Sequence, residues 1–219
     1  MPAIKKNILL FGANSFIAKS FIAHYSEDYH IHPVYRKDAN GLNLDFNNTA
    51  EVKDFCDGLG FSPDAIFFLQ GMNPSMGASQ ITEEHFLKMM RVNLVTPVLL
   101  LSSLKEKMAS DCLVLFISSI AKRKGSYDPS YAAAKSAMTG LMYSLANAYP
   151  SRRFNIISLG LVEGSPVFEG MSEDFRAKHA TRMQNGNFVK AENVIMVMDM
   201  LIKNTNINTT DIAVDSGYN

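Results

Sequence analysis

A regular alternation of short apolar runs with longer stretches of helical period most constrains what this chain can fold into. The runs are four to six residues long and rich in Ile, Leu, Val and Phe, which is typical of strands buried on both faces. The stretches between them repeat their apolar residues at helical spacing. This pattern predicts an α/β, doubly wound fold: a parallel sheet with helices on both faces.

Seven runs predict strands, and six stretches predict helices. The expected strands are residues 8–11, 31–35, 42–46, 65–69, 112–117, 155–158 and 211–214. The expected helices are residues 15–26, 49–57, 82–108 with a break near Val92, 130–149, 172–183 and 191–203. Residues 71–79 have the strongest turn composition and directly follow a strand, which is where open α/β sheets place a ligand crevice.

Length and charge limit the classes of protein to which the chain can belong. With 219 residues, 47% of them hydrophobic, we expect one compact domain over residues 1–219. Lys and Arg number 21 and Asp and Glu number 21, without long blocks of one sign, so we expect no nucleic-acid partner. The longest apolar run, 112–117, is far shorter than the roughly 18 residues of a membrane helix, so we expect no membrane span.

The cysteines and histidines point to a cytoplasmic protein without a metal site. Cys56 and Cys112 lie on separate expected elements and suit free thiols in a reducing compartment. His30 and His32 share one strand face but would give a metal only two ligands. The basic and apolar start of the chain is similar to a secretory signal, which polar residues at positions 14, 15 and 19 interrupt.

The first expected strand runs straight into a helix through a turn of small residues. Residues 11–18 read FGANSFIA, and Gly12 is the one glycine among them. The free backbone N–H groups and the dipole at such a helix start can hold a pyrophosphate. An ordinary strand-to-helix turn would give the same pattern, so the motif by itself is weak.

A second cluster combines Tyr131 and Lys135 in a strongly helical segment. A spacing of four puts both side chains on one helix face, so the ammonium group can lie beside the phenol. Ser118 and Ser119 close the fifth expected strand, and Asn93 lies on an earlier helix. Each has a structural alternative: the serine as a strand cap, the asparagine bonded to backbone, the tyrosine packed at the surface and the lysine solvated.

At these positions the chain resembles the short-chain dehydrogenase/reductase family over nearly its whole length. The motifs occur in the family's order: the glycine loop at 12–18, LDF at 44–46, QG at 70–71, VNL at 92–94, ISSIA at 117–121, YAAAK at 131–135, LG at 159–160 and VDSGY at 214–218. The resemblance implies a Rossmann-type fold. It also implies an oxidoreductase that transfers a hydride between a nicotinamide cofactor and a carbonyl or secondary alcohol.

By this resemblance the catalytic residues are Asn93, Ser119, Tyr131 and Lys135. Hydride transfer to a carbonyl leaves an alkoxide that an acid must protonate, and Tyr131 would be that acid. Ser119 would hold the substrate oxygen, Lys135 would bond the nicotinamide ribose, and Asn93 would anchor a water that relays the proton. The usual spacing to the tyrosine points to Ser118, whereas the Ser-Ser-x-Ala context favours Ser119, and we choose the latter.

To act as this acid near neutral pH, Tyr131 needs an environment that lowers its pKa. Its ordinary pKa of about 10 would have to fall by roughly 3 units for it to work near neutral pH. An exposed ion pair on a helix supplies only about 0.3 to 0.5 kcal/mol. Lys135 therefore has to act from a desolvated cleft, together with the positive nicotinamide of the oxidised cofactor.

The resemblance also implies a set of residues that bind the cofactor. They are Gly12, Asn14, Ser15, Phe16, Ile17, Arg36, Lys37, Asp45, Gly71, Asn93, Tyr131, Lys135, Gly160 and Val162. Four positions depart from the family: Phe16 and Ala18 stand where it has glycine, Gln70 where it has asparagine, and Leu159 where it has proline. Phe16 must point away from the pyrophosphate, so this departure puts the cofactor affinity in doubt.

The end of the second expected strand favours NADP(H) over NAD(H). Enzymes that use NAD place an acid there against the ribose 2′-hydroxyl. Here Arg36 and Lys37 come first, and two cations suit a 2′-phosphate, although they are also ordinary solvated loop residues. Residues 36–41 are too few to hold the helix that the family has before its third strand, so we expect the adenosine end of the cofactor to be unusually open.

Residues 164–188 follow the sixth expected strand and, by the resemblance, form a lid over the substrate. They mix apolar and basic side chains, as an amphipathic lid helix would for any substrate. A ketone with apolar bulk and an acidic or phosphorylated ketone both stay open.

The resemblance further implies that helices 93–108 and 130–149 pack across a two-fold axis as a homodimer or homotetramer. The apolar face would comprise Val95, Leu99, Met138, Leu141, Met142 and Leu145. The alternative is that these side chains are buried within the subunit.

We therefore expect a cytoplasmic NADP(H)-dependent oxidoreductase that acts as a ketone reductase on a small molecule. A catalytically inactive relative that binds a dinucleotide as a sensor or scaffold is the main alternative, and the eroded glycine loop supports it. A nucleotide-sugar epimerase or dehydratase shares the fold, but only residues 160–219 follow Leu159, too few for the separate substrate domain of that class.

Overall fold

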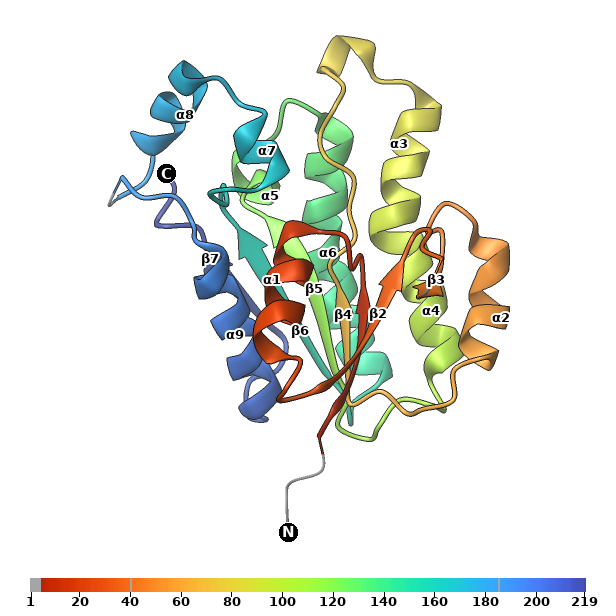
Figure 1. The fold of residues 1–219 in the computed structure, drawn as a ribbon. Coiled ribbons are helices and arrows are strands. Elements are labelled where there is room, and N and C mark those ends of the chain that lie inside the picture. Colours follow the sequence, from red (N-terminus) through yellow and green to blue (C-terminus); the bar gives the residue numbers. More distant parts are fainter. Residues whose placement is uncertain (1–4, 40, 185) are drawn as a thin grey trace.

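Seven parallel strands form one sheet at the centre of the computed structural model, which describes residues 5–39, 41–184 and 186–219. Their order is β3-β2-β1-β4-β5-β6-β7, and every neighbouring pair is parallel. The strands are β1 (Asn7–Phe11), β2 (His30–Tyr35), β3 (Leu42–Asn43), β4 (Ala65–Phe68), β5 (Leu113–Ser119), β6 (Arg153–Leu159) and β7 (Thr210–Val214). This confirms the predicted Rossmann-type, doubly wound α/β fold (Figure 1).

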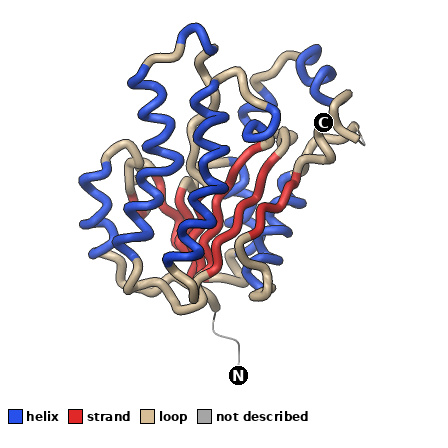
Figure 2. The backbone as a smooth tube through the Cα atoms, turned by 180° about the vertical axis from the view of Figure 1, so that it is seen from behind, coloured by secondary structure: helices blue, strands red, loops and turns tan. Residues whose placement is uncertain are grey.

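Helices connect the strands and cover both faces of the sheet (Figures 1 and 2). The α-helices of the described residues are α1 (Phe16–Tyr25), α2 (Val52–Asp57), α3 (Glu83–Met90), α4 (Thr96–Leu104), α5 (Ala121–Lys124), α6 (Pro129–Ala148), α7 (Pro166–Glu169), α8 (Glu173–Ala180) and α9 (Ala191–Lys203). Short 3₁₀ turns lie at Thr49–Glu51 and Ala78–Gln80. A π-helical turn at Arg91–Val95 joins α3 to α4, where the sequence predicted a break near Val92.

Alternate residues of the strands enter two separate cores, one on each face of the sheet. Leu9 and Phe11 of β1 join the core under α2, α4 and α6, whereas Ile8 and Leu10 join the core under α1 and α9. In the first core the ring of Phe68 stacks on that of Phe11, with centroids 5.2 Å apart. The two-residue period of the strands thus explains why the runs 8–11, 65–69 and 112–117 are apolar throughout.

Part of the apolar face that was expected to form the subunit interface is instead buried inside the subunit. Met138, Met142 and Leu145 of α6 are buried inside the subunit, in the core under α2, α4 and α6. They point toward the sheet because they lie at helical spacing on its inner side. Val95 and Leu99 stay exposed, at 46% and 40% of their surface.

Side-chain caps fix where several helices begin. Ser15 caps α1 by accepting the N–H of Ala18, Thr82 caps α3, and Asp128 caps α6. Within residues 164–188, for which the sequence predicted a lid, Ser172 caps α8 at the predicted start. Such caps set the entry points of the helices on the side of the sheet where the strands end.

Some boundaries differ from those predicted. β3 is limited to Leu42–Asn43 instead of reaching residue 46, because Asp45 accepts the backbone N–H of Asn47 and turns the chain. Residues 36–39 and 41, between β2 and β3, form no helix, as expected. The α5 and α7 helices were not predicted, since four residues are too few to display a helical period.

One stretch is long and apolar enough to cross a membrane by length and composition alone. Among the described residues it is the helical segment Glu83–Leu104, in which an 18-residue window has a mean hydropathy of 1.3 and is 44% buried inside the molecule. The segment contains no long unbroken apolar run, because polar residues interrupt it. Leu100, Leu101 and Leu104 pack in the core, as in the core helix of a soluble protein, so this is weak evidence for a span.

Candidate active site

Three of the four residues expected to be catalytic meet where β5 ends beside the first turns of α6. Ser119 is the last residue of β5, while Tyr131 and Lys135 lie one turn apart on α6. The Nζ atom of Lys135 lies 5.7 Å from the centre of the Tyr131 ring. The helix therefore places the ammonium group beside the phenol, as the spacing of four residues predicts.

The two serines at the end of β5 have different surroundings. Ser118 is 2% exposed, and its hydroxyl donates to the carbonyl of Lys135, so it ties β5 to α6. Ser119 faces the opposite way, because successive side chains of a strand alternate. Its hydroxyl accepts the N–H of Ala121 and forms a hydrogen bond with Tyr131. Ser119, rather than Ser118, is thus the serine whose hydroxyl lies beside Tyr131.

Lys135 is buried and has lost most of its hydration. It is 4% exposed, and its Nζ donates to the carbonyl of Ile117 at 2.8 Å. Burial lowers the pKa of Lys135 to about 7, since no carboxylate of the described residues compensates for the lost water. This is the desolvated position that the sequence argument requires.

Tyr131 stays protonated in the protein as described. Burial raises the pKa of its phenol, and the hydrogen bond with Ser119 partly opposes that rise. The chain's own residues thus leave the phenol above its ordinary pKa rather than below it. A protonated phenol beside Ser119 can donate a proton to an oxygen held there.

Asn93 lies in the π-helical turn and presents an unpaired acceptor. The residue is fully buried, and its Nδ2 donates to the carbonyl of Met89 at 2.9 Å. No described residue donates to its Oδ1. A Cβ added to Gly71 would lie 3.8 Å from that Oδ1 and 3.8 Å from Nζ of Lys135. Oδ1 of Asn93 and Nζ of Lys135 therefore both border the position that a side chain on Gly71 would occupy, which we call the gap at Gly71.

The turn between β1 and α1 can hold an anion. Gly12 has a φ of +77°, and a Cβ there would lie 2.4 Å from the backbone N of Gln70, so no other residue fits without a shift. No described acceptor takes the N–H groups of Phe16 and Ile17 at the start of α1. These groups and the helix dipole suit a pyrophosphate.

The Phe16 side chain packs within the protein. It is half buried against the core under α1 and α9, and its Cζ lies 3.4 Å from the position of a Cβ on Gly164. Asn14, in the same turn, is exposed. The ring thus extends toward Gly164, and the N–H of Phe16 at the start of α1 has no acceptor among the described residues.

The other residues expected to bind the cofactor lie at neighbouring strand ends. Arg36 and Lys37 are exposed directly after β2, and Asp45 follows β3. Gly160 follows β6, where a Cβ would lie 2.8 Å from Cα of Asp215. Val162 is buried and forms a bridge with Val189. All of them lie on the side of the sheet where the parallel strands end.

Sequence reasoning missed Asp128 and His85. Asp128 is fully buried at the start of α6, and its carboxylate accepts from Nε2 of His85 on α3 at 2.7 Å. The pair Asp128-Pro129 is a helix-start signature that could have indicated the cap. Nothing in the sequence links it to a histidine on α3.

The sequence matches one family model over most of its length. A model described as enoyl-(acyl carrier protein) reductase matches residues 30–219. A search of curated proteins with this sequence found no match.

Solved structures share the fold over the whole chain. A short-chain dehydrogenase family protein from Francisella tularensis subsp. tularensis SCHU S4 has a TM-score of 0.86 at 17% identity, covering 98% of this chain and 99% of that chain. A 4-hydroxyisoleucine dehydrogenase mutant complexed with NADH and succinate has a TM-score of 0.88 at 19% identity (97% and 98%). A small-chain dehydrogenase in complex with NADPH has a TM-score of 0.84 at 20% identity (98% and 98%). With the family match and this shared fold, the chain belongs to the short-chain dehydrogenase/reductase family.

Proposed function

We propose that this protein is an NADP(H)-dependent oxidoreductase that reduces a ketone to a secondary alcohol. The observation that carries the proposal is the desolvated Lys135 beside the protonated Tyr131, which is hydrogen bonded to Ser119. In this arrangement a carbonyl oxygen at Ser119 has a proton donor within reach. We also propose that residues 1–219 form one domain, in which residues 164–188 form a lid over the substrate.

Each residue has a separate task in the proposed reaction. A reduced nicotinamide, when bound, supplies the hydride that the carbonyl carbon receives. Ser119 holds the carbonyl oxygen, and Tyr131 gives its phenolic proton to that oxygen as negative charge develops. Lys135 stabilises the phenolate that remains. Oδ1 of Asn93 holds a water in the gap at Gly71, next to Lys135, through which the proton of Tyr131 is restored.

The residues around the site fit a nicotinamide dinucleotide. The N–H groups of Phe16 and Ile17 would bind the pyrophosphate, with Gly12, Asn14 and Ser15 shaping the turn. Asp45 would contact the adenine, while Gly160 and Val162 would border the nicotinamide. Among proteins with this fold, one is described as complexed with NADH and another with NADPH.

The preference for NADP(H) rests on Arg36 and Lys37. Both are exposed after β2, and no ion pair to them is found among the described residues. Arg36→Ala should weaken NADPH binding by about 10-fold to 100-fold, because a hydrogen bond to a charged group contributes about 1.5 to 3 kcal/mol. NADH binding should change less than about threefold. Isothermal titration calorimetry with NADPH and with NADH measures the two dissociation constants.

A cation at the opposite end of the strands serves as the control for Arg36. Lys105 follows the end of α4 and is exposed, so Lys105→Ala removes the same charge far from the proposed site. It should leave both nucleotide affinities unchanged. Equal losses of NADPH and NADH affinity in Arg36→Ala would contradict a role for Arg36 in cofactor choice.

The main alternative is a catalytically inactive relative that binds a dinucleotide as a sensor. The departure from glycine at Phe16 favours it, whereas the arrangement of Ser119, Tyr131 and Lys135 favours an enzyme. Oxidation of NADPH that depends on an added ketone distinguishes the two. The test uses a panel of apolar, aromatic and anionic ketones, because the lid segment exposes Phe175 but also carries Arg176 and Lys178. Binding of NADPH without turnover of any panel member would favour the sensor.

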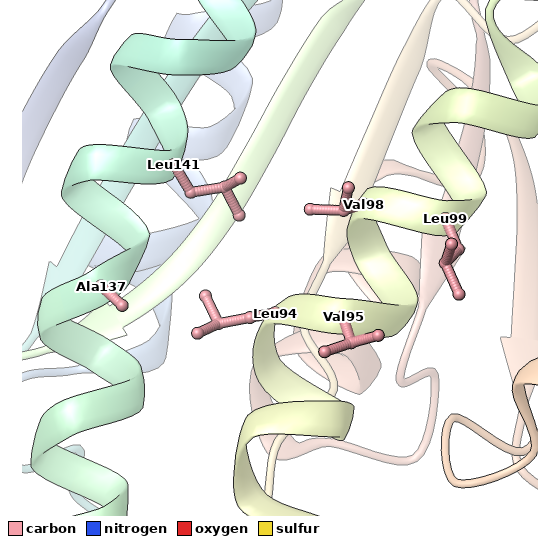
Figure 3. Close-up of a pocket in the computed structure, with 6 residues that line it drawn as sticks. All are labelled: Leu94, Val95, Val98, Leu99, Ala137 and Leu141. Atoms are coloured by element: carbon pink, nitrogen blue, oxygen red, sulfur yellow. The ribbon is translucent and has the colours of Figure 1, made fainter. Parts of the chain in front are cut away.

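We also propose that α4 and α6 pack across a two-fold axis to form a homodimer or homotetramer. An apolar groove runs between the two helices in Figure 3. It is lined by Leu94, Val95, Val98, Leu99, Ala137 and Leu141. Isologous packing of a second copy would cover this surface.

Leu99→Asp tests this assembly. A charge in the buried centre of the interface should shift the protein toward the monomer, because an unpaired charge is costly to bury. The control is Met196→Asp on α9, since Met196 is also exposed (61%) but lies on the other face of the sheet. Light scattering measures the mass. An unchanged oligomer in Leu99→Asp, or a monomeric unaltered protein, would contradict the proposal.

The cytoplasm is the proposed compartment. Both cysteines are free and buried, and burial raises the pKa of Cys56 to about 11, so the thiol stays protonated and unreactive. This suits a reducing compartment.

A further inference from the structure

The carboxylate of Asp128 is fully buried, and its two oxygens serve different segments. Oδ1 faces the first turn of α6, where it accepts the N–H of Ser130 at 3.0 Å, the hydroxyl of Ser130 and the N–H of Tyr131 at 3.3 Å. This oxygen caps the helix that carries Tyr131 and Lys135. A serine or threonine could provide such a cap with a single oxygen, so Oδ1 does not account for an aspartate here.

The second oxygen reaches two other segments. Oδ2 accepts from Nε2 of His85 at 2.7 Å and from the backbone N–H groups of Ser75 at 3.2 Å and Met76 at 3.4 Å. His85 is itself 8% exposed, in the first turn of α3. The Asp128 side chain therefore joins the start of α6 to α3 and to the loop after β4, which lie 43 to 53 residues earlier in the chain.

Burial alone would raise the pKa of Asp128, but hydrogen bonds from Ser130, His85, Ser75 and Tyr131 hold that pKa below its usual range. The group is therefore a buried carboxylate satisfied by its neighbours. Removing one donor leaves part of a buried charge unpaired, which costs more than the hydrogen bond itself contributes.

The loop held by Oδ2 borders the candidate active site. It begins at Gly71, next to Oδ1 of Asn93 and Nζ of Lys135. It ends at Gly77, where a Cβ would lie 2.8 Å from Oη of Tyr127, the residue before Asp128. One end of residues 71–77 thus lies beside Asn93 and Lys135. The other end lies against Tyr127, in the segment before α6.

We propose that His85 and Asp128 form a positioning pair that holds residues 71–77 against the first turn of α6. The pair keeps the gap at Gly71 open between Asn93 and Lys135, and it orients Tyr131 through the backbone of α6. This inference rests on the proposed function for its effect on turnover. Neither residue touches the reacting atoms, so both act through Tyr131 and the loop.

The test compares His85→Phe, which keeps a ring without a donor, with His85→Gln, which keeps a side-chain N–H. The kcat of ketone reduction should fall by about 10-fold to 100-fold in His85→Phe, because small displacements of catalytic groups have effects of that size. His85→Gln should recover most of this loss. NADPH affinity should change less than about threefold in both. Tyr29→Phe is the control: it removes a hydrogen bond to Asp199 on the other face of the sheet, and kcat should stay unchanged.

Amide hydrogen exchange tests the pair independently of turnover. The N–H groups of Ser75 and Met76, which donate to Oδ2 of Asp128, should exchange at least about tenfold faster in His85→Phe than in the Tyr29→Phe control. Asp128→Ser retains a cap for α6 and loses the oxygen that binds the loop, so it should show the same faster exchange. In the double variant, which combines His85→Phe with Asp128→Ser, these N–H groups should exchange little faster than in either single variant.

The outcomes separate the two proposals. Unchanged exchange of the Ser75 and Met76 N–H groups in both variants, or equal kcat in His85→Phe and the control, overturns the positioning pair. If the unaltered protein reduces no ketone, the proposed function fails, while the exchange rates still decide whether the pair holds the loop. A role in stability alone predicts a lower melting temperature with unchanged kcat and unchanged exchange of this loop relative to other loops.

Discussion

Replacing Tyr131 with phenylalanine should lower kcat for ketone reduction by about 1000-fold, within the range of 10²-fold to 10⁴-fold for loss of a general acid. The phenol hydroxyl is the proton donor in reach of an oxygen held at Ser119, and phenylalanine keeps the ring but loses that donor. The ring next to Lys135 remains, so the local packing is preserved. NADPH affinity should change less than about fivefold, since the anion site at α1 is not altered.

The experiment follows NADPH absorbance with and without ketone for Tyr131→Phe, with nucleotide affinity measured in parallel. Tyr143→Phe is the matched control, because Tyr143 lies on the same helix and is exposed. It should retain full activity. A kcat for Tyr131→Phe within about threefold of that of the control would remove Tyr131 from the chemistry and favour the sensor.

Gly12→Ala should abolish measurable NADPH binding and destabilise the protein by about 3 kcal/mol. The new Cβ would lie 2.4 Å from the backbone N of Gln70, and the φ of +77° is unfavourable for any residue with a Cβ. The turn must shift to relieve the contact, which moves the N–H groups of Phe16 and Ile17. The melting temperature should fall by about 6 to 12 °C.

Gly60→Ala is the control for this effect. No atom lies within 4 Å of a Cβ at Gly60, which is in a loop before β4. Thermal melts and NADPH titrations on the two variants and the unaltered protein provide the comparison. If Gly12→Ala is destabilised but keeps its NADPH affinity, binding of the dinucleotide does not depend on this turn. An unchanged melting temperature would contradict the close approach of Gly12 to Gln70.

The sequence predicted the architecture because strand and helix periods differ throughout this chain. Each strand of the described sheet was anticipated, and the pattern is clearest in β1, β4 and β5, which are apolar on both faces. The break near Val92 corresponds to the π-helical turn that holds Asn93. Such turns are frequent at functional sites. The end of β3 was predicted too late, because the contact of Asp45 with Asn47 depends on local hydrogen bonding that no apolar pattern reveals.

The candidate site was predictable only in part. The spacing of Tyr131 and Lys135 and the family resemblance indicated which residues could meet, but Ser118 and Ser119 could be distinguished only by the direction in which each points from β5. The link between His85 and Asp128 joins residues 43 positions apart and has no sequence signature. Met138 of α6 could not be assigned to the core or the surface until the helix was placed on the sheet.

Thermal denaturation of the unaltered protein with NADPH and with NADH tests the central claim, that a nicotinamide dinucleotide binds at the α1 turn and beside Tyr131. At a concentration of 100 times Kd, a ligand adds about 2.7 kcal/mol to the stability of the folded state. For a protein of this size that raises the melting temperature by about 5 to 10 °C. We expect this shift with NADPH, a smaller one with NADH at the same concentration, and none with NADPH in Gly12→Ala. The absence of a shift with either nucleotide up to millimolar concentration would contradict the account.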